Sequence, residues 1–421
     1  MARIVYSTLL FILTPLLLVY LRSRSKKDHA YNKRKSERFG LKKLQQTDLL
    51  IHAVSMGEAQ AAFKLLEKIN HHFPQLSVTF TCSSPTASSL IQSQLGDKVQ
   101  HCYLPFDVNW CVKRFVKQVK PKACIIMETE LWPNLIHQLK TNGCHVALAN
   151  GRLSEKSFHQ YQKFSRLTAN MLKKVDLLLV QTDTEVKRFV NLGADPQKCH
   201  SCGSIKFDIS PNKHQAALTK ILKANLNRPV WVAGSVHPGE FKSMLKAHKK
   251  LLETQPNVLL ILCPRHPEAF SEAQLDIIAS GLTYTSRSVT AKLPNDVNVI
   301  LGDSMGELMG FYGIAQAAFV GGSLINNGGH NPLEPAAFGI PVSVGPYHHD
   351  FLDIVEQLEQ TGGLQVCPYV DSFEHWLLSN FEDQQLRQSR GLQAMEVVAR
   401  NQGASQKQFD ALLPALTTAA G

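Results

Sequence analysis

Residues 49–69, LLIHAVSMGEAQAAFKLLEKI, contain the pattern that decides the fold. Leu49–Val54 is a short apolar run of the length expected for a buried strand. After a small polar turn, Leu65, Leu66 and Ile69 recur at helical spacing and give a helix one apolar face. A strand, a turn and an amphipathic helix in this order predict a parallel βαβ unit.

The same alternation runs through the rest of the chain in two series. The first series of predicted strands is Leu49–Val54, Val78–Cys82, Ala123–Met127, His145–Ala149 and Leu177–Val180. The second series is Val230–Ala233, Val258–Leu262, Val297–Leu301, Ala317–Val320 and Pro341–Val344. The predicted fold class is therefore α/β, with two doubly wound parallel sheets.

The predicted domains follow from these two series. We place an anchor and its basic flank at 1–43, a first domain at 44–210, a polar linker at 211–228 and a second domain at 229–421. The second domain ends in a Gln-rich tail, from about residue 373 to residue 420, that is predicted to be helical. Because such folds bind ligands at the carboxyl ends of their strands, we expect the two domains to face a ligand-binding cleft.

Basic charge is concentrated at the start of the chain. The 421 residues carry 45 Lys+Arg and 34 Asp+Glu, a formal net charge of +11. Residues 1–43 hold 11 basic and 2 acidic side chains (+9), residues 44–208 hold 19 and 13 (+6), and residues 209–421 hold 15 and 19 (−4). A nucleic-acid enzyme more often spreads its basic charge along a groove, so we exclude nucleic acid and expect a membrane surface as the anionic partner.

The first residues resemble a membrane anchor. Ile4–Leu21 is an uncharged apolar run of 18 residues, enough for a helix of roughly 27 Å against a bilayer core of about 30 Å. The basic residues that follow are Arg22, Arg24, Lys26, Lys27, Lys33, Arg34, Lys35, Arg38, Lys42 and Lys43. Basic residues beside a span stay cytoplasmic. We therefore predict an inner (cytoplasmic) membrane location, inner-membrane lipids as partners and a cytoplasmic catalytic body.

Two alternatives to a spanning anchor also begin with an apolar N-terminal run. A cleaved signal peptide is disfavoured because the apolar run is long and no A-x-A-like site follows it. A helix lying in the membrane interface stays open, since Pro15 interrupts the run.

Four predicted helix starts share the capping-box pattern, in which Glu follows the N-cap residue by three positions. They are Ser55–Glu58, Thr182–Glu185, Ser304–Glu307 and Asn331–Glu334. Capping alone explains Glu185. Gly57 and Gly306 precede two of the other glutamates and allow a ligand to approach the backbone closely. Gly328-Gly329 leads into the predicted helix start at Asn331, where N–H groups and the helix dipole suit a phosphate.

Two further clusters follow predicted strands. Glu128 and Glu130 are spaced so that both lie on one face of an extended chain. Such a pair holds a proton or orients a basic partner, unless it is a solvated strand end. Pro264 and Arg265 follow another strand, where the arginine either binds a phosphate through two hydrogen bonds or is an ordinary loop residue.

Several kinds of site are not indicated. The sequence has no G-x-G-x-x-G and no G-x-x-x-x-G-K-[ST], so neither a dinucleotide fingerprint nor a P-loop is predicted. Nine scattered cysteines fit a reducing compartment. Cys199 and Cys202 form an isolated C-x-x-C without the second ligand pair that zinc needs. We predict no metal and no cofactor, and we interpret 347–350 (YHHD) as a surface loop.

Eight longer segments carry a family resemblance. They are IHAVSMGE, YLPFD, METELWPNLI, NGRLSEKS, GSIKFD, PRHPE, GDSMGELM and GGHNPLEPAAFGIPVSVGP. In this order they resemble the bacterial 3-deoxy-D-manno-octulosonic acid (Kdo) transferases of the lipopolysaccharide lipid A–core pathway. The resemblance implies a glycosyltransferase-B fold with two Rossmann-like domains. It also implies transfer of one or more Kdo units from CMP-Kdo to a lipid A precursor, lipid IVA.

The resemblance also implies roles for individual residues. Glu58 is expected to be the general base on the acceptor hydroxyl, and Glu128 and Lys206 to assist the transition state. The expected CMP-binding residues are Pro264, Arg265, Met305, Gly306, Glu307, Asn331, Pro332, Leu333 and Glu334. Two segments depart from the family pattern, with Gly151 in place of Ala and GSVH at 234–237 where A/T-S-T-H is common.

The mechanism and the acceptor contacts follow as expectations. Displacement with a single base predicts inversion, and the helix dipole is expected to keep Glu58 ionised. A basic run beside Phe115 and Val119 is predicted to be either a face for lipid phosphates or a solvated helix face. Its members are Lys113, Arg114, Lys117, Lys120 and Lys122.

Other functions fit the same predicted fold. One is another membrane-associated nucleotide-sugar glycosyltransferase, and another is a nucleotide-sugar epimerase, which would turn over without an acceptor. A tethered binding module without catalysis is disfavoured by the intact Glu58, Glu128 and Arg265.

Overall fold

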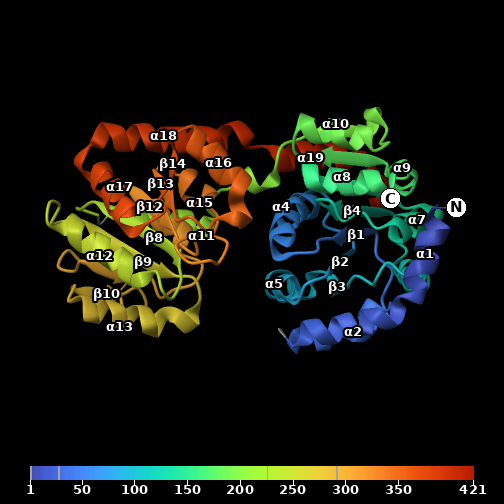
Figure 1. The fold of residues 1–421 in the computed structure, drawn as a ribbon, viewed down its shortest axis with the longest axis horizontal. Helices are drawn as coiled ribbons and strands as arrows, with labels where there is room; N and C mark the ends of the chain where they lie inside the picture. The colour runs from blue at the N-terminus through green and yellow to red at the C-terminus, as the bar shows by residue number, and fades with distance from the viewer. Residues whose placement is uncertain (1, 27–28, 225, 291–292) are drawn as a thin grey trace. The chain divides into compact units, whose positions relative to one another are not determined.

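The computed structural model describes residues 2–26, 29–224, 226–290 and 293–421. Lys27 of the basic flank and residue 225 of the predicted linker lie outside these ranges. The chain forms two compact units, Met1–Asp208 together with Gly403–Gly421, and Ile209–Gln402. Each unit is built around its own parallel sheet (Figure 1).

The first unit contains a seven-stranded sheet in the order β3-β2-β1-β4-β5-β6-β7. Its strands are β1 (Leu49–His52), β2 (Val78–Cys82), β3 (Gln100–Tyr103), β4 (Ala123–Met127), β5 (His145–Gly151), β6 (Leu177–Val180) and β7 (Cys199–Ser201). β1 pairs in parallel with both β2 and β4, so the strand order reverses between β1 and β4. Ligands of doubly wound sheets bind beside the carboxyl ends of the strands at such a reversal.

The second unit repeats this plan in the order β10-β11-β9-β8-β12-β13-β14. Its strands are β8 (Val230–Val236), β9 (Leu259–Pro264), β10 (Tyr284–Ser286), β11 (Val299–Leu301), β12 (Ala317–Val320), β13 (Val342–Val344) and β14 (Leu364–Val366). β8 pairs in parallel with β9 and β12, so the order reverses between β8 and β12.

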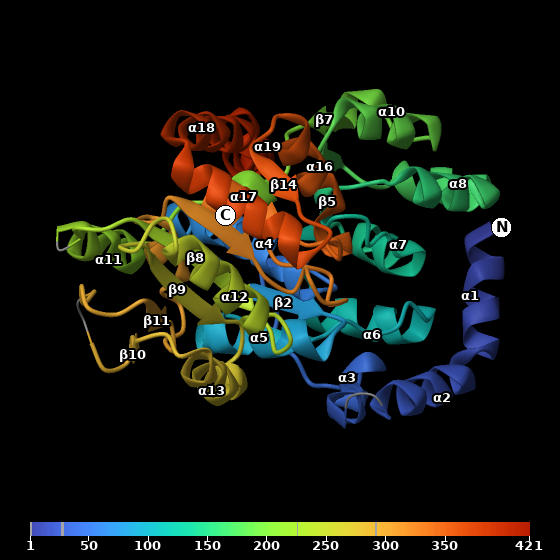
Figure 2. The same cartoon turned by 60° about the vertical axis from the view of Figure 1, so that its left-hand side comes forward.

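Helices cover both faces of each sheet (Figures 1 and 2). The first unit contains α1 (Ala2–Ile12), α2 (Thr14–Ser25), α3 (Lys35–Arg38), α4 (Met56–His72), α5 (Pro85–Leu95), α6 (Asn109–Val119), α7 (Pro133–Thr141), α8 (Glu155–Lys163), α9 (Ser165–Leu172), α10 (Asp183–Asn191) and α19 (Ala404–Ala420). The second contains α11 (Lys213–Ala224), α12 (Phe241–Leu252), α13 (Phe270–Ser280), α14 (Leu308–Tyr312), α15 (Leu333–Ala336), α16 (Leu352–Gln360), α17 (Val370–Glu382) and α18 (Gln384–Asn401).

The cores lie between these helices and the sheets. Along β1, Leu49 and Ile51 belong to one apolar cluster and Leu50 to the cluster on the opposite face, as the two-residue period of a strand requires. Leu65 and Ile69 of α4 are buried in the first of these clusters, which confirms the predicted helix face.

All ten predicted strands are present, and the part of the chain that the structure describes contains four additional strands, β3, β7, β10 and β14. These four are the edge strands of the two sheets. The central strands are buried on both faces and are therefore continuous apolar runs. Edge strands are partly solvated, and sequences such as QHCY at 100–103 or YTS at 284–286 do not stand out as apolar.

The domain boundaries differ from the predicted ones at two places. α11 occupies most of the predicted linker, because Leu218 and Leu222 are buried in the core of the second unit. α17 and α18 confirm the helical tail, but α19 belongs to the first unit. Asp208 accepts the N–H groups of Gly403 and Ser405 at 2.6 Å each and so fixes the start of α19.

The predicted anchor is bent. Among the described residues no single helix is long and apolar enough to cross a membrane, and α1 and α2 meet that criterion only as a pair with an angle of 58° between them. Pro15 lies in the first turn of α2. Polar side chains hold α1 on the first unit: Tyr6 donates to Asp107 at 3.0 Å, and Ser7 donates to Asn134 at 2.7 Å.

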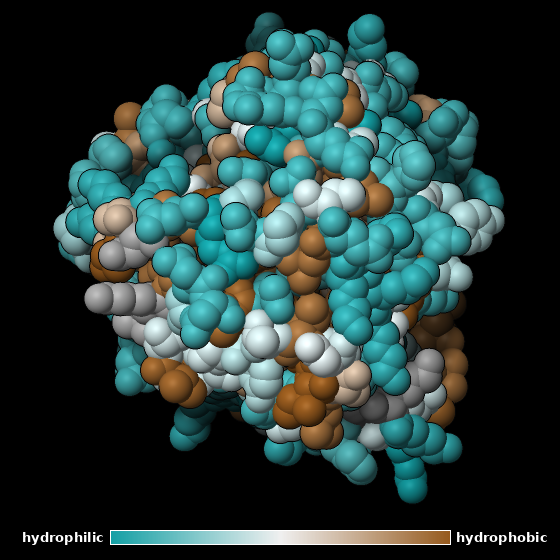
Figure 3. Space-filling view, turned by 90° about the vertical axis from the view of Figure 1, so that its left-hand side faces the viewer, coloured by the Kyte–Doolittle hydropathy of each residue, from teal (hydrophilic) through white to brown (hydrophobic). Residues whose placement is uncertain are grey.

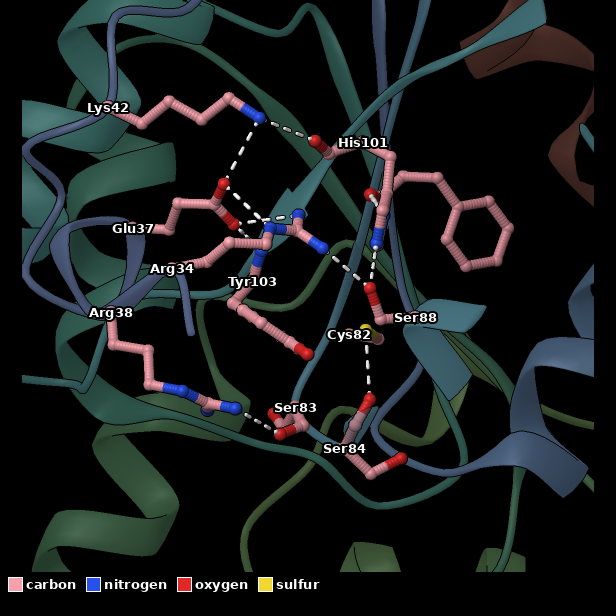
Figure 4. A network of polar contacts seen from close by, with 11 residues as sticks. Arg34, Glu37, Arg38, Lys42, Cys82, Ser83, Ser84, Ser88, His101 and Tyr103 are labelled. Atoms are coloured by element: carbon pink, nitrogen blue, oxygen red, sulfur yellow. Dashed lines mark hydrogen bonds and ion pairs between the residues drawn. The ribbon is translucent and has the colours of Figure 1, made fainter. Parts of the chain in front are cut away.

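The basic flank is folded onto the carboxyl ends of β2 and β3 (Figure 4). The buried Glu37 carboxylate pairs with Arg34 at 2.8 Å and with Lys42 at 3.2 Å, and it accepts the Tyr103 N–H at 2.9 Å. Arg38 is buried over the Tyr103 ring, 4.1 Å from its centroid. Arg34, Arg38 and Lys42 therefore bind groups of the first unit, and Arg24, a further flank cation, donates to the Tyr20 hydroxyl at 3.2 Å.

Candidate active site

Glu58 lies at the start of α4, directly after β1. The Ser55 hydroxyl accepts the Glu58 N–H, and the Glu58 carboxylate accepts the Ser55 N–H at 3.2 Å, which completes the predicted capping box. Val54 N–H donates to the second carboxylate oxygen at 2.8 Å. Burial raises the pKa of Glu58, and the charge of Glu128 adds to the shift. This effect opposes that of the helix dipole, and the raised pKa makes the carboxylate a stronger base.

Glu128 directly follows β4 and pairs with Lys206 at 3.3 Å. Its φ of +52° lies in the left-handed region, and its N–H donates to the Ala149 carbonyl of β5 at 2.9 Å. The chain is therefore not extended at Glu128, and the predicted face shared with Glu130 through strand geometry is wrong. The prediction that a carboxylate here orients a basic partner is confirmed by the Lys206 contact.

Glu130 is the third carboxyl group of this cluster. Burial raises its pKa to about 7, and the charges of Glu58 and Glu128 add to the shift. Like charges held close together favour a protonated carboxyl. Glu130 therefore holds a proton near neutral pH, which was the other predicted use of the pair.

Lys206 is held by residues that are distant in sequence. It lies in a 3₁₀ turn, η4 (Ile205–Phe207), whose Ile205 N–H donates to Asn150 Oδ1 at 2.9 Å. The Asn150 N–H donates to Gln408 Oε1 at 2.8 Å, and Gln408 Nε2 donates to the Gly203 carbonyl at 3.2 Å. Asn150 and Gln408 are fully buried. The end of β5 and α19 thus fix the lysine loop.

Sequence reasoning missed Asn150 and Gln408. The one signal for Asn150 is its position before Gly151, because Asn is among the few residues that adopt the left-handed conformation found here, with φ +54°. No local signal marks Gln408, since its partners lie more than 200 residues away in the chain.

The second unit contains the predicted donor residues. Pro264 ends β9, and the Arg265 N–H donates to the Val236 carbonyl at the end of β8 at 2.9 Å. Half-buried Arg265 lies at the carboxyl ends of these two strands, beside His237 and His330. Burial of the two histidines and the positive charge of Arg265 lower their pKa values.

An open surface pocket of about 460 Å³ adjoins Glu307, which was expected to bind CMP. Its lining residues are Arg287, Ser288, Val289, Thr290, Ser304 and Glu307. Arg287 donates two hydrogen bonds to the Glu307 carboxylate, at 2.9 and 3.0 Å. Burial acts to raise the pKa of Glu307, but the Arg287 contacts bring it below its ordinary value. Met305 is exposed and Gly306 has φ +84°. Sequence reasoning missed Arg287.

Two of the four predicted capping boxes do not form. The Ser304 hydroxyl donates to Glu307, but α14 begins only at Leu308. Asn331 Oδ1 accepts the Leu333 N–H at 3.2 Å, and α15 is only four residues long, with Gly339 in the left-handed conformation (φ +68°) three residues beyond its end. So short a helix has a weak dipole, and the predicted phosphate site at this helix start loses its basis. At Thr182–Glu185 the capping box is complete, as predicted.

The remaining candidates are structural. Cys199 and Cys202 are buried, free thiols, and burial raises the pKa of Cys199 to about 11. The segment 347–350 lies at the surface. Within the described residues no three His, Cys, Asp or Glu side chains lie close enough together to hold a metal ion.

Comparisons with known proteins assign this chain to a family. The family of the 3-deoxy-D-manno-octulosonic-acid transferases (kdotransferases) matches residues 33–209. The 3-deoxy-D-manno-octulosonic acid transferase of Haemophilus influenzae is 40% identical over 424 aligned residues and covers 99% of both chains.

Two solved structures share the fold at low identity. A glycosyltransferase from Rickettsia africae is 12% identical, with a TM-score of 0.50 over 89% of this chain and 99% of its own. A UDP-GlcNAc 2-epimerase from Neisseria meningitidis is 11% identical, with a TM-score of 0.56 over 87% of this chain and 100% of its own. They confirm the two Rossmann-like α/β domains.

Fold alone does not separate a transferase from an epimerase, because both occur among these structures. Identity of 40% along the whole length does separate them. The chain belongs to the 3-deoxy-D-manno-octulosonic acid transferase family, and it is a glycosyltransferase that transfers Kdo in lipopolysaccharide core biosynthesis.

Proposed function

We propose that the chain transfers Kdo from CMP-Kdo to a lipid A precursor, lipid IVA, with inversion and at the inner membrane. The observation that carries the proposal is the cluster of Glu58, Glu128, Glu130 and Lys206. Glu58 and Glu128 lie at the carboxyl ends of β1 and β4, where the strand order reverses and doubly wound sheets bind ligands. The family resemblance implies roles in the reaction for three of these four residues, Glu58, Glu128 and Lys206.

The proposed reaction is a direct displacement. A hydroxyl of the acceptor attacks the anomeric carbon of Kdo, the bond from that carbon to the phosphate oxygen breaks, and CMP leaves with the electron pair. Glu58 takes the hydroxyl proton, a task for which a raised pKa suits it. Lys206 contacts an anionic group of the donor, and Arg265 meets the charge that develops on the phosphate. One base and one displacement invert the anomeric centre.

Membrane association is supported by the surface of α1 and α2. The large apolar side chains there that are more than half exposed are Ile4, Val5, Leu9, Phe11, Ile12, Leu16, Leu18 and Val19. Removing such apolar surface from water is favourable by about 25 cal/mol per Å². The face of the molecule drawn in Figure 3 is, by contrast, largely hydrophilic. Bent by 58° and held on the first unit, the pair favours a position in the membrane interface over a straight span.

The basic run of α6 supports a contact with lipid phosphates only in part. Phe115 and Val119 are buried in the core and do not face lipid, contrary to the predicted arrangement. Lys122 donates to the Ala419 carbonyl at 3.0 Å. Lys113, Arg114 and Lys117 are exposed on the outer face of α6, and we propose these three as the contact.

The test of the proposed base is Glu58→Gln. We expect CMP-Kdo binding to persist and turnover to fall by about 10²-fold or more, the usual contribution of a general base. Glu185→Gln is the matched control, because it changes the same carboxylate in a second capping box of the same unit. The assay is CMP release by the purified protein with and without lipid A precursor.

The outcomes are separable. Near-normal turnover of Glu58→Gln, or an equal loss in Glu185→Gln, contradicts the assignment of Glu58. Turnover of CMP-Kdo that does not depend on the acceptor contradicts transfer to a lipid.

A further inference from the structure

Two histidines of the second unit form a pair that no role assigned so far uses. His237 follows β8, and His330 ends the Gly-rich loop that begins after β12. Their Nε2 atoms are 2.7 Å apart, and the two rings are nearly parallel, with 9° between their planes. One Nε2 must donate and the other accept, so a single proton lies between the two rings in their neutral forms.

A buried carboxylate fixes the two loops that carry this pair. Glu240, with no exposed surface, accepts the N–H groups of His237 at 2.9 Å and of Gly322 at 2.8 Å. It also accepts the N–H groups of Ser323 and Leu324, at 3.0 and 2.9 Å. The carboxyl ends of β8 and β12, the neighbours at the reversal of strand order, are therefore clamped together with the pair above them.

The surroundings of the pair include a positive charge, and the nearby carboxylate of Glu240 is already fully hydrogen-bonded. Arg265 lies close enough to act on both rings, and His266 stands with its ring centroid 5.6 Å from that of His237. Burial, reinforced by Arg265 and the neighbouring histidines, lowers the pKa of His330 to about 3 and lowers that of His237. The Glu240 carboxylate is occupied by four N–H groups. The free protein thus presents one fixed positive charge and two neutral imidazoles at a ligand-binding edge.

We propose that the His237–His330 pair binds the phosphate of the donor and takes up one proton as the negative charge on that phosphate increases. This inference rests on the proposed donor, CMP-Kdo. When the carbon–oxygen bond breaks, the phosphate changes from a monoanionic diester to a dianionic monoester. The proton for the imidazole pair comes from solvent, and the hydroxyl proton of the acceptor goes to Glu58. A dianion beside the pair favours uptake of a proton, after which the pair has two free N–H groups, one on each ring, where the neutral pair has only one.

The test is calorimetric titration of the full-length protein with CMP at pH 8, in two buffers of different ionisation enthalpy. The difference in heat between the buffers gives the number of protons taken up. We expect uptake of a fraction of a proton per CMP, because burial and Arg265 hold both histidine pKa values low in the free protein, and no uptake with cytidine, which lacks the phosphate. His237→Gln and His330→Gln should each lose most of the uptake and bind CMP about tenfold more weakly, as expected for a lost charge-assisted hydrogen bond. His375→Gln, an exposed histidine of α17, is the matched control.

Each outcome decides one claim. CMP binding without proton uptake, or uptake that both variants retain, overturns the role of the pair and leaves the donor assignment intact. Uptake with free Kdo but not with CMP assigns the pair to the sugar carboxylate and overturns the phosphate contact. Failure of the wild-type protein to bind CMP overturns both the inference and the proposed donor. Because the two variants break the same contact, a loss of proton uptake in only one of them also contradicts the proposed role of the pair.

Discussion

Glu58 and Glu185 occupy equivalent positions in two capping boxes of the same unit. What distinguishes them is their surroundings. Glu185 accepts the Leu153 N–H, whereas the charge of nearby Glu128 adds to the effect of burial in raising the pKa of Glu58. A capping role is therefore compatible with the catalytic role proposed for Glu58, and the neighbouring charge is what distinguishes Glu58 from Glu185.

Glu130→Gln tests this cluster through stability. Between about pH 4.5 and pH 7 the folded protein keeps a proton on Glu130 that the unfolded chain has released, because the folded pKa is raised to about 7. The free energy of unfolding of the wild type therefore falls as the pH rises through this window. The glutamine variant lacks that loss, so its advantage should grow from pH 5 to pH 8, on the order of 1–3 kcal/mol.

Thermal unfolding at several pH values measures this difference. Glu155→Gln, an exposed glutamate of α8, should show none of it. A constant offset between Glu130→Gln and the wild type at every pH would mean that Glu130 is not the titrating group.

At the scale of elements, the position of α19 affects both the core of the first unit and the loop that carries Lys206. It follows the whole second unit in sequence, yet Phe409, Leu412 and Leu416 complete the core of the first (Figure 1). The same helix places Gln408 against Asn150 and Gly203. The C-terminal helix is therefore both a cover for the first sheet and a support for the Lys206 loop.

Gln408→Leu should remove that support while keeping the volume of the side chain. We expect kcat to fall about tenfold and CMP binding to stay unchanged, since an orphaned buried N–H or carbonyl costs about 1–3 kcal/mol and loosens the loop. Gln406→Leu on the same helix, where the side chain is exposed, should leave kcat unchanged.

A double-mutant cycle separates positioning from general damage. In a Lys206→Ala background, Gln408→Leu should have little further effect on kcat, because both changes act through the same ammonium group. Fully additive losses would show that Gln408 does not act through Lys206.

At the scale of the whole molecule, charge is divided between the two halves of the chain. Residues 1–208 carry +15, the sum of +9 and +6, and residues 209–421 carry −4. Part of this excess is internal, because Arg34, Arg38 and Lys42 contact the first unit in the network of Figure 4. The exposed remainder includes Lys113, Arg114 and Lys117 of α6.

Reversing these three α6 charges to Glu should raise the KM for the lipid acceptor by about tenfold or more, because each basic residue near an anionic surface contributes about 1 kcal/mol. The effect should shrink in high salt, since screening shortens the range of the charges. The matched control reverses Lys213, Lys220 and Lys223, exposed on α11 of the second unit. Steady-state kinetics with each substrate varied in turn measure both; a change confined to the KM for CMP-Kdo would contradict the acceptor contact.

Burial explains which strands could be predicted from the sequence, and helix length explains which capping boxes formed. Strands buried on both faces were all found because their sequences are continuous apolar runs, and each missed strand is an edge strand with a partly solvated sequence. The capping boxes at Ser55 and Thr182 formed because long helices follow them, whereas Ser304 and Asn331 precede helices of five and four residues.

The candidate site divides in the same way. Glu58, Glu128 and Arg265 were predicted because each follows an apolar strand that the sequence reveals. Arg287, Asn150, Gln408 and the His237–His330 contact were not, because each acts through a partner on another element.

The sequence by itself determined the two α/β halves and the family, and it supplied Glu58 and Glu128 as candidate catalytic carboxylates, because these depend on local periodicity and on long matching segments. Only the tertiary structure decided that α19 returns to the first unit, that Glu128 turns out of its strand to meet Lys206, and that three carboxyl groups share one cluster. These features depend on contacts between residues far apart in the chain, and such contacts leave no periodic signal in the amino-acid order.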